Sequence, residues 1–131
     1  MIQLNSYLNC TDKTSVVGVT CIKVVGSFSK RIAYLGDMII VCVQKVNIRK
    51  YVLLKDRLQK KFRVGSIHRG LLLRSKVNFK RINGVFFRFN RNQCAIIGRN
   101  YAPLSNKVYG PVLKEFCYRW PSLGCTTMCV L

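Results

Sequence analysis

Residues 77–89 read VNFKRINGVFFRF, and this stretch contains the sharpest local structural signal in the chain. Asn and Gly both tolerate positive φ, so the dipeptide Asn83-Gly84 predicts a type I′ turn between two antiparallel strands. Because side chains alternate between the two faces of a strand, apolar residues can point inward here while Lys80, Arg81 or Arg88 points outward. An ordinary solvated hairpin has the same pattern. Since almost no acidic residue lies nearby to balance these cations, we favour contact with RNA.

Short apolar runs rich in Val, Ile and Phe recur along the chain, bounded by Gly, Asn, Asp and Ser. Runs of this length and composition are typical of β-strands. Long helical crossovers are missing between them, so the pattern predicts a mainly β fold, a small closed antiparallel barrel of five strands, rather than a parallel sheet. The five predicted strands are Val19–Val25, Met38–Val43, Ile67–Leu73, Val85–Phe89 and Cys94–Ile97.

The segment Gly110–Trp120 predicts a short C-terminal helix. Pro111 stands where a first helical residue belongs, and Pro121 ends the helix. Four apolar side chains then recur at the spacing of one helical face, which we interpret as core packing; they are Leu113, Phe116, Cys117 and Trp120.

A second helix is predicted over Tyr51–Lys61. Tyr51, Leu54 and Leu58 share one face of this segment, beneath four basic residues, Lys55, Arg57, Lys60 and Lys61. A basic loop fits the segment nearly as well.

Charge is the compositional feature that restricts function most. The 131 residues contain 23 Lys and Arg against 4 Asp and Glu, a formal net charge of +19, although half of the sequence is apolar. A disordered basic tail lacks such an apolar half. A folded domain with so much unbalanced charge is expected to sit against dense negative charge, and the phosphates of nucleic acid are the first candidate. Residues 44–100 carry sixteen of the basic residues and one acid, so we expect the partner there.

The length indicates one domain over residues 1–131. The seven cysteines are odd in number and three of them lie in apolar runs, which favours a reducing compartment over disulfides. No CxxC pair occurs, and His68 is distant in sequence from the one close pair, Cys125 and Cys129, so we expect no structural metal. We also expect no signal peptide, no transit peptide and no membrane span.

The chain offers little for catalysis. It has four carboxylates and one histidine, and a structural role is available to Asp37 in a turn, to Asp56 beside two cations and to Glu115 near a helix start. A metal-dependent nuclease needs a cluster of carboxylates, and a cysteine nucleophile paired with His68 would lack an orienting group. No glycine-rich phosphate loop occurs. We therefore expect no enzymatic activity and no cofactor.

Motifs spread in order over nearly the whole chain resemble one family, the bacterial and organellar large-subunit ribosomal protein L-fourteen. The most specific stretch is Phe79–Ile97, where Asn83-Gly84, Arg88-Phe89, Asn92 and Cys94 fall at the spacing of that family. The other similar motifs are Met1-Ile2-Gln3, Leu8-Asn9, Cys21–Val24 with Gly26, Gly36–Ile39, Leu71–Lys76 and Tyr109–Val112.

The resemblance implies a five-stranded barrel with a projecting β-ribbon and short C-terminal helices, serving as a structural constituent of the large ribosomal subunit in translation. It implies binding to large-subunit rRNA, bridges to small-subunit rRNA, and the ribosomal proteins L-three and L-nineteen as neighbours. It also implies that a ribosome-silencing factor can occupy the surface that forms these bridges. Carried over by position, the rRNA-binding residues are Lys23, Lys30, Arg31, Arg49, Arg74, Lys76, Lys80, Arg81, Arg88 and Lys107.

The chain departs from the family pattern in three places. Thr14–Gly18 stands where the family usually reads Ser-Gly-Ala-Arg-Arg. The Pro-Arg-Gly of the ribbon reads Ile48-Arg49-Lys50, and relative to the family a basic insertion follows at about 51–61. The tail, Pro121–Leu131, keeps little beyond its apolar character. This pattern of losses resembles that of a fast-diverging organellar gene. Because Met1 aligns with the family's own start, we expect synthesis and function inside a mitochondrion, with a plastid or a bacterial-type cytoplasm as the alternatives.

Two other classes of function stay open on the sequence. A free single-stranded nucleic-acid-binding barrel needs aromatic faces on one sheet for base stacking. Phe86, Phe87 and Phe89 are candidates, although adjacent residues of a strand point to opposite faces. A cationic membrane-surface protein needs a long amphipathic helix, which only Tyr51–Lys61 approaches, and we expect no membrane association.

Overall fold

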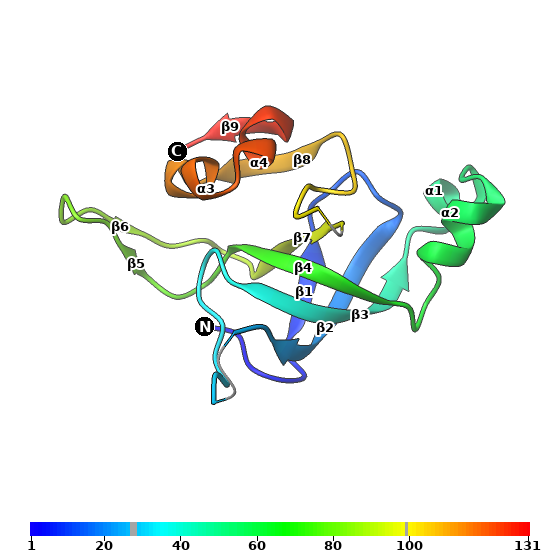
Figure 1. The fold of residues 1–131 in the computed structure, drawn as a ribbon, viewed down its shortest axis with the longest axis horizontal. Coiled ribbons are helices and arrows are strands. Elements are labelled where there is room, and N and C mark those ends of the chain that lie inside the picture. Colours follow the sequence, from blue (N-terminus) through cyan, green and yellow to red (C-terminus); the bar gives the residue numbers. More distant parts are fainter. Residues whose placement is uncertain (27–28, 99) are drawn as a thin grey trace.

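The computed structural model describes residues 1–26, 29–98 and 100–131, without the side chains of residues 56–58. Five strands close a barrel in the order β1-β2-β3-β4-β7 (Figure 1). The mainly β fold and the closed five-stranded barrel expected from the sequence are thereby confirmed. The barrel strands are β1 (Tyr7–Cys10), β2 (Val16–Val24), β3 (Met38–Val46), β4 (Ile67–Arg74) and β7 (Gln93–Ile97).

One seam of the barrel is parallel, which corrects the expectation of a fully antiparallel barrel. Four neighbouring pairs run antiparallel, whereas β1 and β7 run parallel, with Cys10 opposite Cys94. Strand direction alternates at each antiparallel seam. An odd number of strands therefore brings the first and the last together in the same direction.

The strand β1 was missed by the sequence analysis, and Val85–Phe89 was wrongly placed in the barrel. β1 has four residues, of which Leu8 is the fully buried one, so it lacks the apolar run by which the other strands are recognised. In place of Val85–Phe89, the structure has Phe86–Phe87 as β6 of a separate two-stranded ribbon.

Two apolar clusters lie on the two sides of β4. Leu72 belongs to the cluster that also contains Leu8, Val41 and Ile96 of the other barrel strands. Leu71 and Leu73 belong to the second cluster, which includes Val112, Leu113, Phe116 and Leu123 of the C-terminal segment. Because the part of β4 from Leu71 to Leu73 is covered on both faces, it reads as a continuous apolar run instead of an alternating one.

The ribbon consists of β5 (Phe79–Lys80) and β6 (Phe86–Phe87) and projects from one end of the molecule (Figure 1). The antiparallel hairpin is confirmed, but the predicted type I′ turn is wrong. The backbone of Gly84 donates to Arg81 at 3.0 Å, and Gly84 has a φ of 79°. Asn83 does not share the positive φ that a type I′ turn requires. The chain thus uses a three-residue loop, a type I turn followed by a left-handed glycine.

The segment predicted as one helix over Tyr51–Lys61 forms two short helices, α1 (Ile48–Val52) and α2 (Asp56–Lys61). The alternative of a basic loop is wrong, and so is the expected position of the helix start. α1 occupies the place where the resemblance puts the Pro-Arg-Gly of a ribbon. Its first turn is capped by Asn47, whose side-chain oxygen accepts from the backbone of Arg49 at 3.1 Å.

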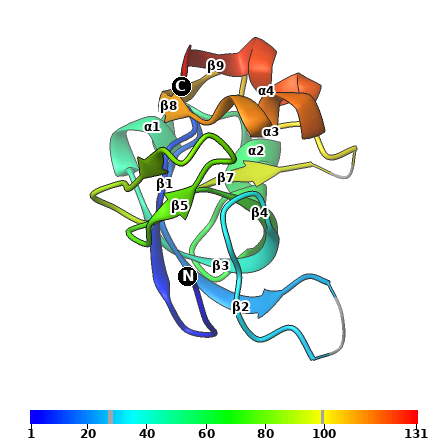
Figure 2. The same ribbon diagram turned by 90° about the vertical axis from the view of Figure 1, so that its left-hand side faces the viewer.

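The C-terminal segment forms a layer over one side of the barrel (Figure 2). It contains β8 (Val108–Val112), α3 (Lys114–Arg119), α4 (Pro121–Thr126) and β9 (Thr127–Val130), with β8 and β9 paired in parallel. The helix predicted from Gly110 begins four residues later, because Gly110 and Pro111 belong to β8. Pro121 separates α3 from α4 and starts the latter. The core interpretation of the apolar face is confirmed for Leu113 and Phe116, which are buried.

Candidate nucleic-acid interface

The carboxylates that the structure describes form hydrogen bonds or ion pairs with other groups of the protein. The carboxylate of Asp12 is buried and accepts a hydrogen bond from the backbone of Ile96 at 3.0 Å. The carboxylate of Asp37 lies 2.8 Å from the ammonium group of Lys30 and accepts from the backbone of Tyr34. Neither group is left to neutralise cations on the surface.

The carboxylate of Glu115 in α3 binds Arg81 of the ribbon. Arg81 donates to both carboxylate oxygens and, at 3.0 Å, to the carbonyl oxygen of Leu131. Its guanidinium carbon lies 4.4 Å from the centre of the Phe87 ring. Hydrogen bonding from Arg81 lowers the pKa of Glu115. Arg81 therefore ties the ribbon to the C-terminal layer, a role that the sequence analysis did not foresee when it placed Arg81 among the rRNA contacts.

Arg74 was also predicted to bind rRNA, but it is buried, with 6% of its surface exposed. Its Nε donates to the carbonyl oxygen of Pro111 at 2.7 Å, and its other two nitrogens donate to the Tyr109 carbonyl and the Gln93 side chain. A Cβ atom at Gly110 would lie 2.6 Å from the guanidinium, so this close approach requires glycine. All three guanidinium nitrogens are engaged within the protein, and this position does not present Arg74 to a phosphate.

The other predicted contact residues face solvent, apart from the half-buried Lys30. They fall into separate places on the fold: on β2 and the connection to β3, on α1, on and beside the ribbon, and before β8. The exposed residues are Lys23, Arg31, Arg49, Lys76, Lys80, Arg88 and Lys107.

The structure exposes further cations that the sequence analysis did not select. For those that lie between residues 44 and 100, the signal that could have found them is the charge of that region taken as a whole. The further cations are Lys13, Lys45, Lys50, Lys55, Lys60, Lys61, Arg63, Arg69, Arg91, Lys114 and Arg119.

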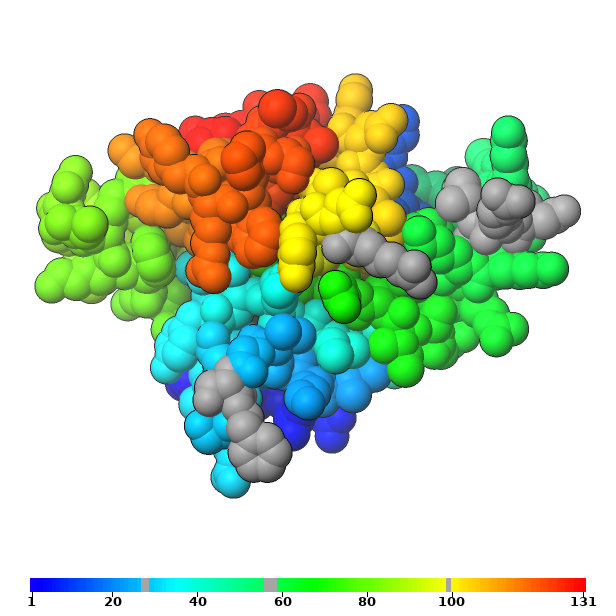
Figure 3. Space-filling model, viewed as in Figure 1, coloured from blue at the N-terminus to red at the C-terminus, as the bar shows by residue number. Residues whose placement is uncertain are grey.

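Cations gather at both ends of the long axis of the molecule. The ribbon lies at one end and the helices α1 and α2 lie at the other, with the barrel between them (Figures 1 and 3). Lys80 and Arg88 are exposed on or beside the ribbon, and Arg49 and Lys50 are exposed on α1. A partner that follows this axis meets positive charge at each end, as an extended polyanion requires.

The phenylalanines of the ribbon do not form an open stacking surface. Phe86 is exposed, whereas Phe87 and Phe89 are half-buried and pack against the cluster that includes Leu71 and Leu113. The expectation that adjacent phenylalanines face opposite ways is confirmed. Of the three candidates for base stacking, only Phe86 is exposed to a single strand.

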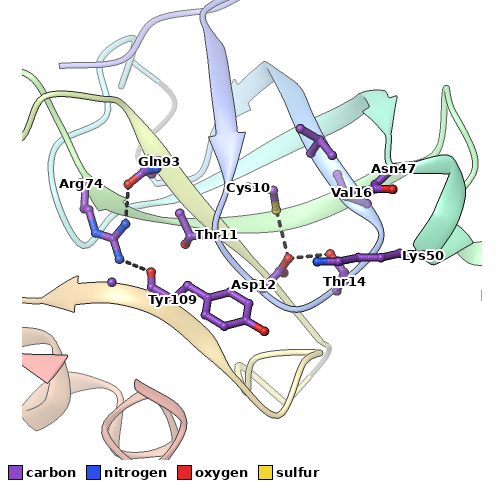
Figure 4. Close-up of a pocket in the computed structure, with 12 residues that line it drawn as sticks. Cys10, Thr11, Asp12, Thr14, Val16, Asn47, Lys50, Arg74, Gln93 and Tyr109 are labelled. Atoms are coloured by element: carbon purple, nitrogen blue, oxygen red, sulfur yellow. Dashed lines mark hydrogen bonds between the residues drawn. The ribbon is translucent and has the colours of Figure 1, made fainter. Parts of the chain in front are cut away.

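A polar pocket of about 390 Å³ lies between the barrel and β8 (Figure 4). Its lining includes Asp12 and Arg74, both of which are hydrogen-bonded within the protein, and Cys10. Hydrogen bonding to Cys94 and burial raise the pKa of the Cys10 thiol well above its usual range. Cys10 therefore stays a thiol and is a poor nucleophile, so the pocket has no activated group among these residues.

His68 supports the α1–α2 segment. One ring nitrogen lies 2.8 Å from the carbonyl oxygen of Lys61 and 3.0 Å from the hydroxyl of Ser66, and burial lowers the pKa of the ring. Over the described residues, no group of three His, Cys, Asp or Glu side chains could hold a metal ion. No helix in the described parts of the chain is long and apolar enough to cross a membrane.

A small closed barrel with its described carboxylates used internally and most of its described cations exposed defines a basic β-barrel protein suited to a polyanionic partner. The family model of ribosomal protein L14p/L23e matches residues 1–131. The chain belongs to this family, which confirms the resemblance to ribosomal protein L-fourteen at the level of the family and indicates a structural constituent of the large ribosomal subunit. Proteins of this kind act at the ribosome and are generally not enzymes.

Proposed function

We propose that the chain binds large-subunit rRNA and contributes to bridges with small-subunit rRNA during translation. The observation that carries this proposal is the contrast between exposed cations and internally bonded carboxylates. Each phosphate that a Lys or Arg neutralises releases counterions, and this release favours association. The family membership supports rRNA as the source of those phosphates.

Seven of the predicted residues form the proposed contact set, because their side chains are exposed: Lys23, Arg31, Arg49, Lys76, Lys80, Arg88 and Lys107. We assign the other three to the architecture of the binding surface. Lys30 and Arg81 are paired with carboxylates, and Arg74 holds β8 against the barrel.

Protein neighbours are proposed at the C-terminal layer, with L-three, L-nineteen and a ribosome-silencing factor as the candidates. Tyr118 and Met128 are strongly exposed there, and side chains of this kind add apolar contact that phosphate binding does not use. For the compartment we propose a mitochondrial ribosome; the seven cysteines, all free, support a reducing environment. Detection of the labelled protein in ribosomes purified from mitochondria, from plastids or from the cytoplasm tests this assignment.

Sedimentation of a gently prepared lysate tests the ribosomal role. We expect the protein to travel with large subunits at low salt and to leave them as the salt concentration rises, because the contacts are with phosphates. A protein that stays at the top of the gradient at low salt would contradict the proposal.

A charge-removing variant tests the ribbon as a contact surface. In Lys76→Ala/Lys80→Ala/Arg88→Ala, we expect weaker association with large-subunit rRNA and an almost unchanged free energy of unfolding, because all three side chains are exposed. The matched control is Lys76→Arg/Lys80→Arg/Arg88→Lys, which keeps the charge and should keep the affinity. Filter binding measures the affinity. Equal binding by both variants would exclude the ribbon as a contact surface for rRNA.

A further inference from the structure

The α1–α2 segment (residues 48–61) and the turn that follows it carry an apolar surface that phosphate binding does not explain. Ile48 is 76% exposed, Val52 66%, Leu53 85% and Val64 60%. Aliphatic side chains neither pair with phosphates nor offer a ring face to a base. Together with the basic residues around them, they suit a partner that offers apolar groups as well as negative charge.

Part of this surface forms a groove, which we call the insertion groove. It has a volume of about 400 Å³ and is lined by Gln44, Lys45, Val46, Ile48, Tyr51 and Val64. Its walls come from the end of β3, from α1 and from the turn before β4. The single aromatic residue of the lining, Tyr51, is half-buried and donates its hydroxyl hydrogen to the Gln59 carbonyl at 3.0 Å, so it is not presented as a stacking platform.

The groove is held in shape by contacts within the protein. Phe62 is buried in the core cluster of the barrel, and Leu54 packs against the same cluster. The side-chain amide of Gln59 donates to the Leu54 carbonyl at 2.9 Å, and His68 holds the Lys61 carbonyl from β4. A partner therefore meets a formed surface and pays little ordering entropy on this side of the interface.

The charge around the groove selects an acidic partner. Lys45 lines the groove, and Arg49 and Lys50 are exposed on the same helix as Ile48. Among the side chains described between residues 44 and 64, every charged one is basic. Apolar anchors surrounded by cations fit a segment with apolar residues on one face and carboxylates on the other.

We propose that the insertion groove docks an acidic amphipathic segment of another protein. The apolar face of the segment fills the groove between Ile48 and Val64, while its carboxylates lie over Lys45 and Lys50. This assignment goes beyond rRNA binding and does not depend on the ribbon contacts, since the ribbon and the helix α1 that lines the groove lie at opposite ends of the molecule (Figure 1).

Binding of the full-length protein to a labelled synthetic peptide tests the proposal. The peptide has leucines on one helical face and glutamates on the other, and a peptide of the same composition in scrambled order is its control. We expect fluorescence anisotropy to show about tenfold weaker binding of the scrambled peptide, because it lacks the apolar face. Equal binding of the two peptides would mean attraction by charge alone and would overturn the proposal.

Two variants locate the site. Ile48→Ser/Val64→Ser should bind the amphipathic peptide about tenfold more weakly than the wild type, since both apolar anchors are lost. Ile82→Ser removes a fully exposed apolar residue at the ribbon turn and should bind the peptide like the wild type. Oligouridylate binding is measured on the same proteins and should not change in Ile48→Ser/Val64→Ser. If that variant loses RNA affinity but not peptide affinity, the groove is an RNA site and the proposal is wrong.

Discussion

At the scale of single residues, equal charges have unequal roles in this protein. Arg74, Arg81 and Arg88 lie within a short stretch of chain, yet the first is buried, the second is paired with a carboxylate and the third is exposed. A cation that holds two parts of the fold together must have its donors satisfied by those parts. The accessibility of the side chain therefore separates architectural cations from contact cations.

Replacing Arg74 tests its architectural role. Arg74→Met should lower the free energy of unfolding by roughly 3 kcal/mol, because the part-buried carbonyl oxygens of Pro111 and Tyr109 and the side chain of Gln93 lose their donor. Arg74→Lys keeps the charge but not the planar fork and should also destabilise the protein. Urea denaturation measures both effects. If the two variants unfold like the wild type but lose rRNA affinity, Arg74 acts as a contact residue after all.

The pair of Arg81 and Glu115 makes stability depend on pH. The folded protein lowers the pKa of Glu115, so the stabilisation is present above the pKa of the unfolded chain, whose ordinary value is 4.5, and is lost as the pH falls through the folded value. Because Glu115 is about one-third exposed, we expect Glu115→Gln to cost only about 1 kcal/mol at neutral pH.

Unfolding of wild type and Glu115→Gln, followed at neutral pH and at pH values below the ordinary carboxyl pKa, measures this dependence. The stability difference between the two proteins should shrink in acid, where the wild-type carboxylate is protonated as well. Lys23→Ala, which removes an exposed charge on β2 outside the ion pair, serves as the control. A difference that stays constant over this range would show that the ion pair does not contribute.

At the scale of elements, the ribbon and the α1–α2 segment are attached to the barrel by a few buried side chains. The ribbon contributes Phe79 and Phe87 to the second cluster, and the α1–α2 segment is anchored by Phe62, which is 5% exposed. Short helices and two-stranded ribbons are marginal when isolated in water. Each element is therefore ordered by its anchor, while its outer side chains stay free for partners.

Removing the anchor Phe62 should make the α1–α2 segment, which forms one wall of the insertion groove, less ordered. Phe62→Ala is expected to lower the free energy of unfolding by roughly 3 kcal/mol, because it leaves a cavity in the core. It should also increase hydrogen exchange in residues 48–61, which lose their support. Leu53→Ser, at an exposed position in the same segment, is the control and should leave both quantities nearly unchanged. Unchanged exchange in Phe62→Ala would mean that other contacts hold the segment.

At the scale of the whole molecule, one barrel carries cationic surface at both of its ends. If all seven exposed residues of the proposed set contact phosphates, the logarithm of the rRNA association constant should fall with the logarithm of the salt concentration with a slope of about −5, at roughly 0.7 per contact. Titration at several salt concentrations measures the slope. A slope near zero would rule out phosphate contacts as the main source of affinity, and Lys76→Ala/Lys80→Ala/Arg88→Ala should reduce its magnitude by about 2.

Much of this architecture could be predicted from local sequence patterns. β2, β3, β4 and β7 have apolar runs, and the hairpin at Asn83-Gly84 has a turn signal, so each could be recognised without knowledge of its neighbours. β1 could not, because its one fully buried residue has meaning only after β7 lies beside it. The parallel seam likewise follows from closure of the barrel, a property of all five strands together.

The candidate site also has features that the sequence predicts and features that only the tertiary structure decides. The sequence alone establishes the excess of positive charge, its concentration in residues 44–100 and the family motifs, because composition and order do not depend on the fold. Only the tertiary structure decides which cations are free, since Arg74 and Arg81 find their partners 35 and 34 residues further along the chain, at Tyr109 and Glu115. It also decides that aliphatic residues of the basic α1–α2 segment border a groove, because the walls of that groove come from separate elements. Charge is a property of residues, whereas its availability to a partner depends on long-range contacts.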